Sequence, residues 1–232
     1  EAILCEGQID VIKCHQAGFD TAVAAQGTAF TEDHARALRH YADSVKLLFD
    51  ADTAGQDAAM KTAGLLIAFE FEVSVVRMPP GHDPDSLIAE KGADALRAVL
   101  DCAGSSVAFQ IEILSERERE RNAGGGGRLR VASAVLQTIA RASKEVQKEQ
   151  LLQEASERLK VSVAALRADM KSVKPVPLRE PQAEQASRGR PAAQGGAGPA
   201  QRAAPQPASR PDAAPPRTEV ALCEFLAQLD ND

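Results

Sequence analysis

The chain has 232 residues, enough for one large domain or two small ones, and 44% of them are hydrophobic, enough for a buried core. Aromatic residues make up only 3%, and tryptophan is absent, so we expect a core of aliphatic side chains. The net charge of −6 is uneven: residues 1–121 carry 21 acidic and 11 basic side chains, so by charge alone this part repels nucleic acid phosphates.

Cysteine spacing and hydropathy exclude further classes. The four cysteines form no C-x-x-C pair and have no histidine at zinc-finger spacing, so we expect no structural zinc and a reducing cytosol; they are Cys5, Cys14, Cys102 and Cys223. No apolar run of membrane length and no signal-peptide pattern is present, so no membrane partner is expected. Because the chain opens at Glu1, directly before an apolar run, we expect a longer protein whose first part is not included.

Four short apolar or β-branched runs predict strands buried on both faces, at residues 2–5, 21–25, 45–49 and 73–77. Helix-length segments separate them, at residues 9–17, 31–42 and 53–68. Thr31 is the expected N-cap of the second helix. This alternation predicts an α/β fold, with a parallel sheet flanked by helices.

After residues 79–81 the strands are expected to stop. Apolar spacing predicts only helices beyond this point, at residues 83–91, 93–102, 105–121, 129–142, 144–159 and 163–172. The charged run ERERERN (116–122) is expected to be solvated, and AGGGGR (123–128) to be a flexible break. Residues 103–173 are therefore predicted to form a small helical subdomain.

The last third of the chain changes in composition. Residues 174–216 hold ten of the thirteen prolines and few large apolar side chains, so we expect a disordered linker. The arginines of this linker either bind nucleic acid weakly or only keep the linker soluble. Residues 217–232 regain helical apolar spacing, and we expect the first helix of a further domain there.

Carboxylates follow three of the predicted strands. Asp50 and Asp52 follow the third strand, and residues two apart in an extended segment point the same way. Ligands of parallel α/β sheets bind beyond the carboxyl ends of the strands. Six acidic side chains are thus expected at one edge of the sheet: Glu6, Asp10, Asp50, Asp52, Asp83 and Asp85.

Clustered carboxylates need a counter-charge to remain ionised together. Mg²⁺ supplies one and prefers hard oxygen ligands, and two such ions about 3.5–4 Å apart promote phosphoryl transfer. Simpler interpretations stay open: Asp52 caps the helix that begins near Thr53, and Asp83 or Asp85 caps the next one. The four histidines are interpreted as surface groups, and Gly27-Thr28 either presents amides to phosphate or forms a plain turn.

A Glu-Gly after one strand and a D-x-D after a later one resemble the Toprim fold. Three longer strings closely resemble bacterial DnaG-type DNA primases: CEGQIDVIKCHQAGFDTAVAAQGTAFTEDHARAL, LLFDADTAGQDAA and PPGHDPDSLIAEKGADAL. The resemblance departs from the family at Gln8-Ile9, Ala51 and Ala25-Gln26, none of which is an expected ligand.

The resemblance implies a role for each acid. Glu6, Asp50 and Asp52 fall on the catalytic, metal-binding positions of the family, for Mg²⁺ or Mn²⁺. Glu6 is also expected to assist proton transfer, and Asp50 to be shared between two ions. Asp10, Asp83 and Asp85 fall on further acidic positions and are additional metal candidates.

The resemblance also implies domains and a function. Residues 1–102 are expected to be a Toprim domain, 103–173 the helical subdomain of the polymerase core, 174–216 the linker, and 217–232 the start of a helicase-binding domain. The expected activity is DNA primase: synthesis of short RNA primers for replication by nucleotidyl transfer from ribonucleoside triphosphates on a single-stranded DNA template. The replicative helicase is the expected protein partner, and the bacterial cytoplasm, at the replication fork, the expected location.

The family's zinc-binding domain and the basic N-terminal half of its polymerase domain are not in the sequence. Zinc is therefore expected only outside these 232 residues, which alone should make little or no primer. Two alternatives are another Toprim enzyme, a nuclease or topoisomerase, and a non-catalytic Toprim scaffold. A topoisomerase needs a nucleophilic tyrosine in a separate domain, and the single tyrosine, Tyr41, ends an early predicted helix.

Overall fold

The structure is a computed structural model that describes residues 1–25, 29–79, 81–121 and 126–173. The described residues lie in one compact unit, Glu1–Glu180. The predictions for Gly27-Thr28, Cys223, the linker at 174–216 and the helix at 217–232 lie outside the described residues.

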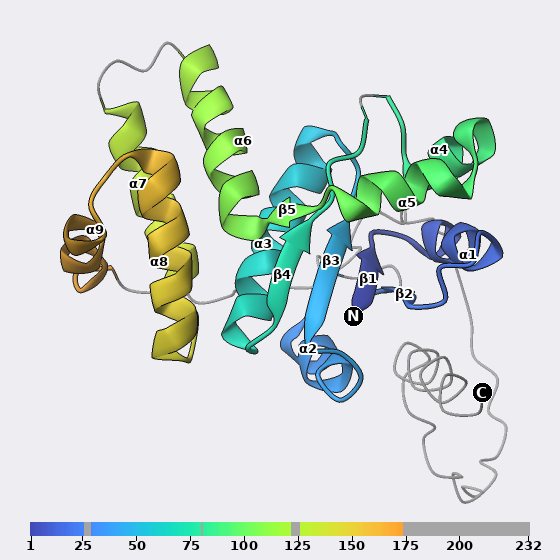
Figure 1. Ribbon diagram of the computed structural model, residues 1–232, viewed down its shortest axis with the longest axis horizontal. Helices are drawn as coiled ribbons and strands as arrows, with labels where there is room; N and C mark the ends of the chain where they lie inside the picture. Colours follow the sequence, from blue (N-terminus) through green and yellow to red (C-terminus); the bar gives the residue numbers. More distant parts are fainter. Residues whose placement is uncertain (26–28, 80, 122–125, 174–232) are drawn as a thin grey trace, which may run out of the picture. The chain divides into compact units, whose positions relative to one another are not determined.

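A sheet of order β2-β1-β3-β4-β5 forms the centre of this unit (Figure 1). The first four strands are parallel, and the apolar runs predicted to be strands all lie in it: β1 Ala2–Cys5, β2 Ala22–Ala24, β3 Ser44–Leu48 and β4 Glu72–Val75. In the register of β1 and β3, Cys5 pairs with Leu48, so these two strands end at the same level. The predicted α/β class is confirmed.

The fifth strand corrects the expectation that strands stop after residues 79–81. β5, Gly104–Ser105, pairs antiparallel with β4 at the edge of the sheet. A Gly-Ser pair has no period-two pattern and weak strand propensity, so no local signal predicts it. The pairing with β4 alone defines this strand.

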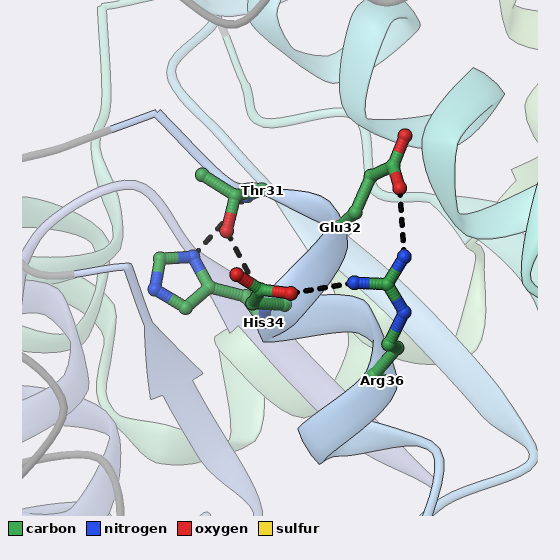
Figure 2. Close-up of polar contacts among 5 residues, drawn as sticks. Thr31, Glu32, His34 and Arg36 are labelled. Atoms are coloured by element: carbon green, nitrogen blue, oxygen red, sulfur yellow. Dashed lines mark hydrogen bonds and ion pairs between the residues drawn. The ribbon is translucent and has the colours of Figure 1, made fainter.

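Three helices connect the parallel strands: α1 Gln8–Gln16, α2 Glu32–Leu38 and α3 Thr53–Ala68. Thr31 is the N-cap of α2, as predicted, and its Oγ1 accepts a hydrogen bond from the backbone N–H of His34 at 3.4 Å. Figure 2 shows this cap, with Arg36 of the same helix turned toward Glu32. The α2 helix is shorter than predicted, since it ends four residues before Ala42.

One face of the sheet packs against α1 together with α4, Pro84–Lys91, and α5, Ala93–Asp101, which lie close together in Figure 1. The apolar core on this face is aliphatic except for Phe19, as the composition predicts. Its most buried members are Cys5, Cys14, Ala22, Leu48, Leu87 and Leu96. Cys5 and Cys14 are free thiols within this core. The core holds the end of β1 against the helix that follows it.

The remaining helices form a second core: α6 Ser106–Glu120, α7 Gly127–Ile139, α8 Glu145–Leu159 and α9 Val163–Met170. Val107, Val135, Ile139, Leu152 and Ala155 are almost completely buried in it. Both α6 and α7 also contact α3, so this helical group packs on the sheet domain. The boundaries drawn at 1–102 and 103–173 stay predictions. No helix within the described ranges is long and apolar enough to cross a membrane.

Candidate functional site

Glu6 and Asp50 follow neighbouring parallel strands at the same edge of the sheet. Glu6 comes directly after β1, and Asp50 comes two residues after β3. The backbone N–H of Asp50 donates to Oε2 of Glu6 at a distance of 3.5 Å. This long contact links two segments that are 44 residues apart in the chain.

Asp10 lies in the first turn of α1, as predicted. Its Oδ2 accepts a hydrogen bond from the backbone N–H of Gly7 at 3.2 Å, so it closes the short turn between β1 and α1. Asp10 is half-buried, whereas Glu6 beside it is exposed. The turn therefore holds one carboxylate inward and leaves the other toward solvent.

Asp52 and Asp83 are helix N-caps, so the simpler interpretation of these two residues is correct. Oδ1 of Asp52 accepts from the N–H of Gly55 at 2.7 Å at the start of α3. Oδ1 of Asp83 accepts from the N–H of Ser86 at 2.7 Å, and the Ser86 Oγ accepts from the N–H of Asp83 at 3.0 Å. Each cap uses only one oxygen of its carboxylate, so capping does not exclude a second ligand.

Asp85 is paired with a lysine. It lies in the first turn of α4 and forms an ion pair with Lys13 of α1, with 3.1 Å between Oδ1 and Nζ. The other five acids form what we call the acid cluster: Glu6, Asp10, Asp50, Asp52 and Asp83.

Mutual repulsion is visible in the acid cluster. Partial burial raises the pKa of Asp50 above its ordinary value, and the charges of Glu6, Asp83 and Asp52 raise it further. Burial also raises the pKa of Asp10, against the opposing hydrogen bond from Gly7, and Asp50, Asp83 and Glu6 add to the rise. By contrast, the hydrogen bonds from Ser86 lower the pKa of Asp83.

The donor set of the acid cluster fits a hydrated Mg²⁺ ion. In the described ranges, no three His, Cys, Asp or Glu side chains converge tightly enough to enclose a metal. Four of the five carboxylates, those of Glu6, Asp10, Asp52 and Asp83, have one oxygen on a backbone N–H and a second oxygen outside that contact. Because Mg²⁺ keeps several waters and is usually bound by one or two carboxylates, such a loose arrangement of hard oxygens suits it.

A hollow of about 570 Å³ opens beside the acid cluster. Asp50, Asp52 and Asp83 line one side of it. Phe109 and Glu116 of α6 line the other, so the helical group contributes to this space. A hollow of this size is large enough for a nucleotide.

His82 also lines the hollow, which the sequence did not predict. Its side chain is only 16% exposed, so the interpretation as a surface group is wrong for this histidine. Its Nδ1 is buried without a hydrogen-bond partner in the described part of the chain, and Oε2 of Glu90 lies 3.9 Å away. The only sequence signal was its position next to Asp83.

Gly55 sets the position of Asp50, although the sequence analysis gave it no role. A Cβ at Gly55 would lie 2.4 Å from the carbonyl oxygen of Asp50, too close for any side chain. The first turn of α3 therefore packs directly on the backbone of the D-A-D segment. Glycine in the first turn of an otherwise alanine-rich helix was the available signal, because alanine is the better helix former.

Arg117 connects α6 to the same segment through Gln56. The Gln56 Nε2 donates to the carbonyl oxygen of Ala51 at 3.1 Å, and its Oε1 accepts from Nη2 of Arg117 at 3.0 Å. Arg117 also pairs with Asp57 at 2.5 Å and is only 24% exposed. The expectation that the run 116–122 is solvated is therefore wrong at Arg117, whose side chain packs against α3.

Comparison with known proteins identifies the domain. Residues 3–88 match the family model described as Toprim-like. This part of the chain is similar to that family. The match contains β1 to β4 and all six predicted carboxylates, so the predicted resemblance is confirmed over this part of the chain.

Curated relatives of this chain are DNA primases. The chain is 36% identical over 166 residues to the DNA primase of Geobacillus stearothermophilus, a match that covers 72% of this chain and 27% of that protein. It is 43% identical over 103 residues to the DNA primase of Rickettsia felis, covering 43% of this chain and 17% of that protein. The matched part thus spans about a quarter or less of these relatives.

Solved structures of bacterial primases share the fold of the Toprim-like domain and the helices that follow it. A DNA primase domain from Pseudomonas aeruginosa superposes with a TM-score of 0.61 at 27% identity, over 73% of this chain and 54% of that one. The Aquifex aeolicus primase, solved with its zinc-binding and RNA polymerase domains, gives a TM-score of 0.57 at 30% identity, over 71% and 38% of the two chains.

Asp50→Asn is expected to stabilise the metal-free protein at neutral pH. A carboxyl whose pKa is higher in the folded than in the unfolded chain favours folding only when protonated, so that contribution is lost as pH rises through the raised pKa. After allowance for solvent screening, we expect a rise of about 1–2 °C in the thermal midpoint at pH 7, or roughly 0.5 kcal/mol. Differential scanning fluorimetry with a chelator measures it.

Asp85→Asn is the matched control, since Asp85 is paired with Lys13. Asp85→Asn should not raise the thermal midpoint at pH 7. The higher thermal midpoint of Asp50→Asn should disappear near pH 3, where the Asp50 carboxyl of the natural chain is protonated. An equal rise in the thermal midpoint for both variants would contradict repulsion between Asp50 and the neighbouring carboxylates.

Gly55→Ala is expected to displace the D-A-D segment. We predict a loss of roughly 1–3 kcal/mol in unfolding free energy because the new methyl group meets the Asp50 backbone. In the control Gly64→Ala, on the same helix, the methyl group meets side chains and no backbone, Arg141 at 3.3 Å and Thr138 at 3.9 Å, and we expect a change within about 1 kcal/mol. Urea denaturation compares them, and equal losses would contradict the special role of Gly55.

Proposed function

We propose that the acid cluster binds divalent cations for nucleotidyl transfer, in a DNA primase that joins ribonucleoside triphosphates into short RNA primers. The observation that carries the proposal is the pairing of Glu6 and Asp50 at adjacent parallel strand ends inside a Toprim-like domain. The DNA primases among its relatives give the substrate class.

Glu6, Asp50 and Asp52 are the proposed catalytic, metal-binding residues. When bound, Mg²⁺ or Mn²⁺ would neutralise the developing phosphate charge and activate the attacking hydroxyl. Asp83 lies close enough to raise the pKa of both Asp50 and Asp10, and the charge of Asp50 also raises the pKa of Asp10. Asp10 and Asp83 are therefore further candidates. Asp85 is a weaker candidate because Lys13 already neutralises it.

The partners belong to the same proposal. A DnaG primase catalytic domain bound to single-stranded DNA is similar to this chain, at 27% identity and a TM-score of 0.59. We propose single-stranded DNA as the template here too, with ribonucleoside triphosphates as substrates and the replicative helicase as partner of residues 217–232. Zinc is proposed only for a domain outside this sequence, and the bacterial cytoplasm as the location.

A topoisomerase receives no support from the single tyrosine. Tyr41 is 48% exposed and comes just before β3, whereas the acids come after the strands. Tyr41 therefore lies at the opposite edge of the sheet from the acid cluster. A non-catalytic scaffold would have no need of five neighbouring carboxylates whose repulsion destabilises the fold.

The test is a chimera in which the matched segment of the G. stearothermophilus DNA primase is replaced by that of this chain. Primer synthesis is measured on single-stranded DNA with radiolabelled ribonucleoside triphosphates. We expect Asp50→Asn with Asp52→Asn to reduce synthesis at least about 100-fold, because a metal ion contributes several kcal/mol of charge stabilisation. Asn keeps the helix cap at position 52, so the fold should survive.

The matched control is Asp20→Asn, which removes an exposed acid that comes before β2 and outside the cluster. It should leave primer synthesis within about twofold of the unsubstituted chimera. Full synthesis by the double variant, or none by the unsubstituted chimera, would overturn the proposal.

A further inference from the structure

A second hollow, of about 400 Å³, lies among α6, α7 and α8, and we call it the basic pocket. Four cationic side chains line it, and they come from all three helices or their ends: Arg119, Arg128, Arg158 and Lys160. Only one acidic side chain, Glu118, lines it with them. Such a surplus of positive charge is unusual in a chain of net charge −6.

Glu118 does not neutralise the basic pocket. Its carboxylate pairs with Arg130, whose Nε donates at 2.9 Å, and with Arg121 at 3.5 Å, neither of which lines the pocket. The hydrogen bond from Arg130 lowers the pKa of Glu118, so this acid is ionised and already paired. Arg121 and Arg130 together carry two positive charges against the single negative charge of Glu118.

The four cations of the pocket are only partly satisfied. Arg128 donates to the carbonyl oxygen of Leu159 at 2.8 Å, and Arg158 pairs with Glu154 at 3.4 Å. Arg119 and Lys160 are exposed and have no ion pair within residues 1–25, 29–79, 81–121 and 126–173. These two cations therefore have no ion-pair partner within the described ranges, although they also line an adjoining hollow that contains Glu112, Glu154 and Glu157.

The start of α7 adds to the positive potential. Gly127, the first residue of this 13-residue helix, lines the pocket, and the N-cap Gly126 provides no side-chain cap. No acidic residue lies in the first turn, where Arg128 lies instead. A cation at a helix N-terminus is unfavourable unless an anion accompanies it. Glu118, which Arg130 already pairs with, lies close to this helix start, since a Cβ at Gly127 would be 3.3 Å from its Oε2. A further anion in the pocket would offset the remaining cost.

The floor of the basic pocket is apolar. Ile111, Val131 and Leu159 line it from the core of the helical group, and each is at most 8% exposed. Pockets for small ligands are typically about 300–1,000 Å³ with a few polar groups on an apolar base. The size and this combination suit a ligand that carries both phosphates and a flat apolar group.

We propose that the basic pocket binds a phosphorylated small molecule of nucleotide size, such as a nucleoside triphosphate, without a metal ion. Arg119 and Lys160 contact its phosphates, and Ile111 and Val131 support its base. The acid cluster lies on the other side of α6, where Ile113 and Glu116 line the first hollow. The two hollows share no residue, so this inference does not rest on the proposed function.

The test is isothermal titration calorimetry of adenosine triphosphate into the 232-residue chain at low salt with a metal chelator. The chelator removes any binding that depends on metal at the acid cluster. We expect binding by the natural chain and roughly tenfold or greater weakening by Arg119→Gln with Lys160→Gln, since each hydrogen bond to a charged group contributes about 1.5–3 kcal/mol.

The matched control is Lys61→Gln with Lys171→Gln, which removes the same charge from two exposed lysines outside the pocket. It should bind adenosine triphosphate like the natural chain, and unchanged thermal midpoints would show that both variants fold. If both double variants bind adenosine triphosphate equally weakly, net charge alone explains the loss. That result would overturn the proposal.

Two further titrations separate the sources of phosphate. Pyrophosphate should bind more weakly than adenosine triphosphate if the apolar floor contributes, and it should lose affinity in the same Arg119/Lys160 variant. Binding of a short oligothymidylate with no binding of adenosine triphosphate would assign the pocket to a nucleic acid backbone and overturn the proposal. No binding of adenosine triphosphate by the natural chain would overturn it as well.

Discussion

Repulsion between carboxylates at one edge of a parallel sheet is the constraint on which the rest of this structure depends. Glu6 and Asp50 are brought together because β1 and β3 are neighbours that end at the same level. Backbone N–H groups hold Asp10, Asp52 and Asp83 beside them. Backbone hydrogen bonds thus stabilise four of the five carboxylates, while burial and the neighbouring charges raise the pKa of Asp50 and Asp10. Such an arrangement destabilises the free protein and becomes favourable when divalent cations bind.

The helices outside the sheet also act on the acid cluster. Gly55 lets α3 approach the backbone of Asp50, and the hydrogen bonds from Arg117 through Gln56 reach the carbonyl group between the two aspartates. The helical group is therefore linked through Gln56 of α3 to the loop that carries the proposed ligands. On its far side the same group carries the basic pocket, so the acid cluster and the basic pocket lie on opposite sides of α6.

Much of this could be predicted from the sequence because the signals are local. Four apolar runs predict the parallel strands, and a helix over 53–68 follows from its composition and its cap. The six acids are visible because each follows a strand directly or lies in the turn or helix start after it. The rest depends on contacts between distant segments. β5 exists only through pairing with β4, and Arg117 leaves solvent only because α3 presents Asp57 and Gln56. Asp85 forms an ion pair with Lys13 of another helix. No pattern along the chain encodes these partners.

The central claim is that divalent cations occupy the acid cluster. The most direct measurement is a crystal structure of the chain soaked in Mn²⁺, with anomalous scattering recorded near the manganese edge. We expect anomalous peaks within coordination distance of the carboxylate oxygens of Glu6, Asp50 and Asp52. Peaks at Asp85 or elsewhere with none at these three side chains, at a Mn²⁺ concentration that saturates binding in solution, would contradict it.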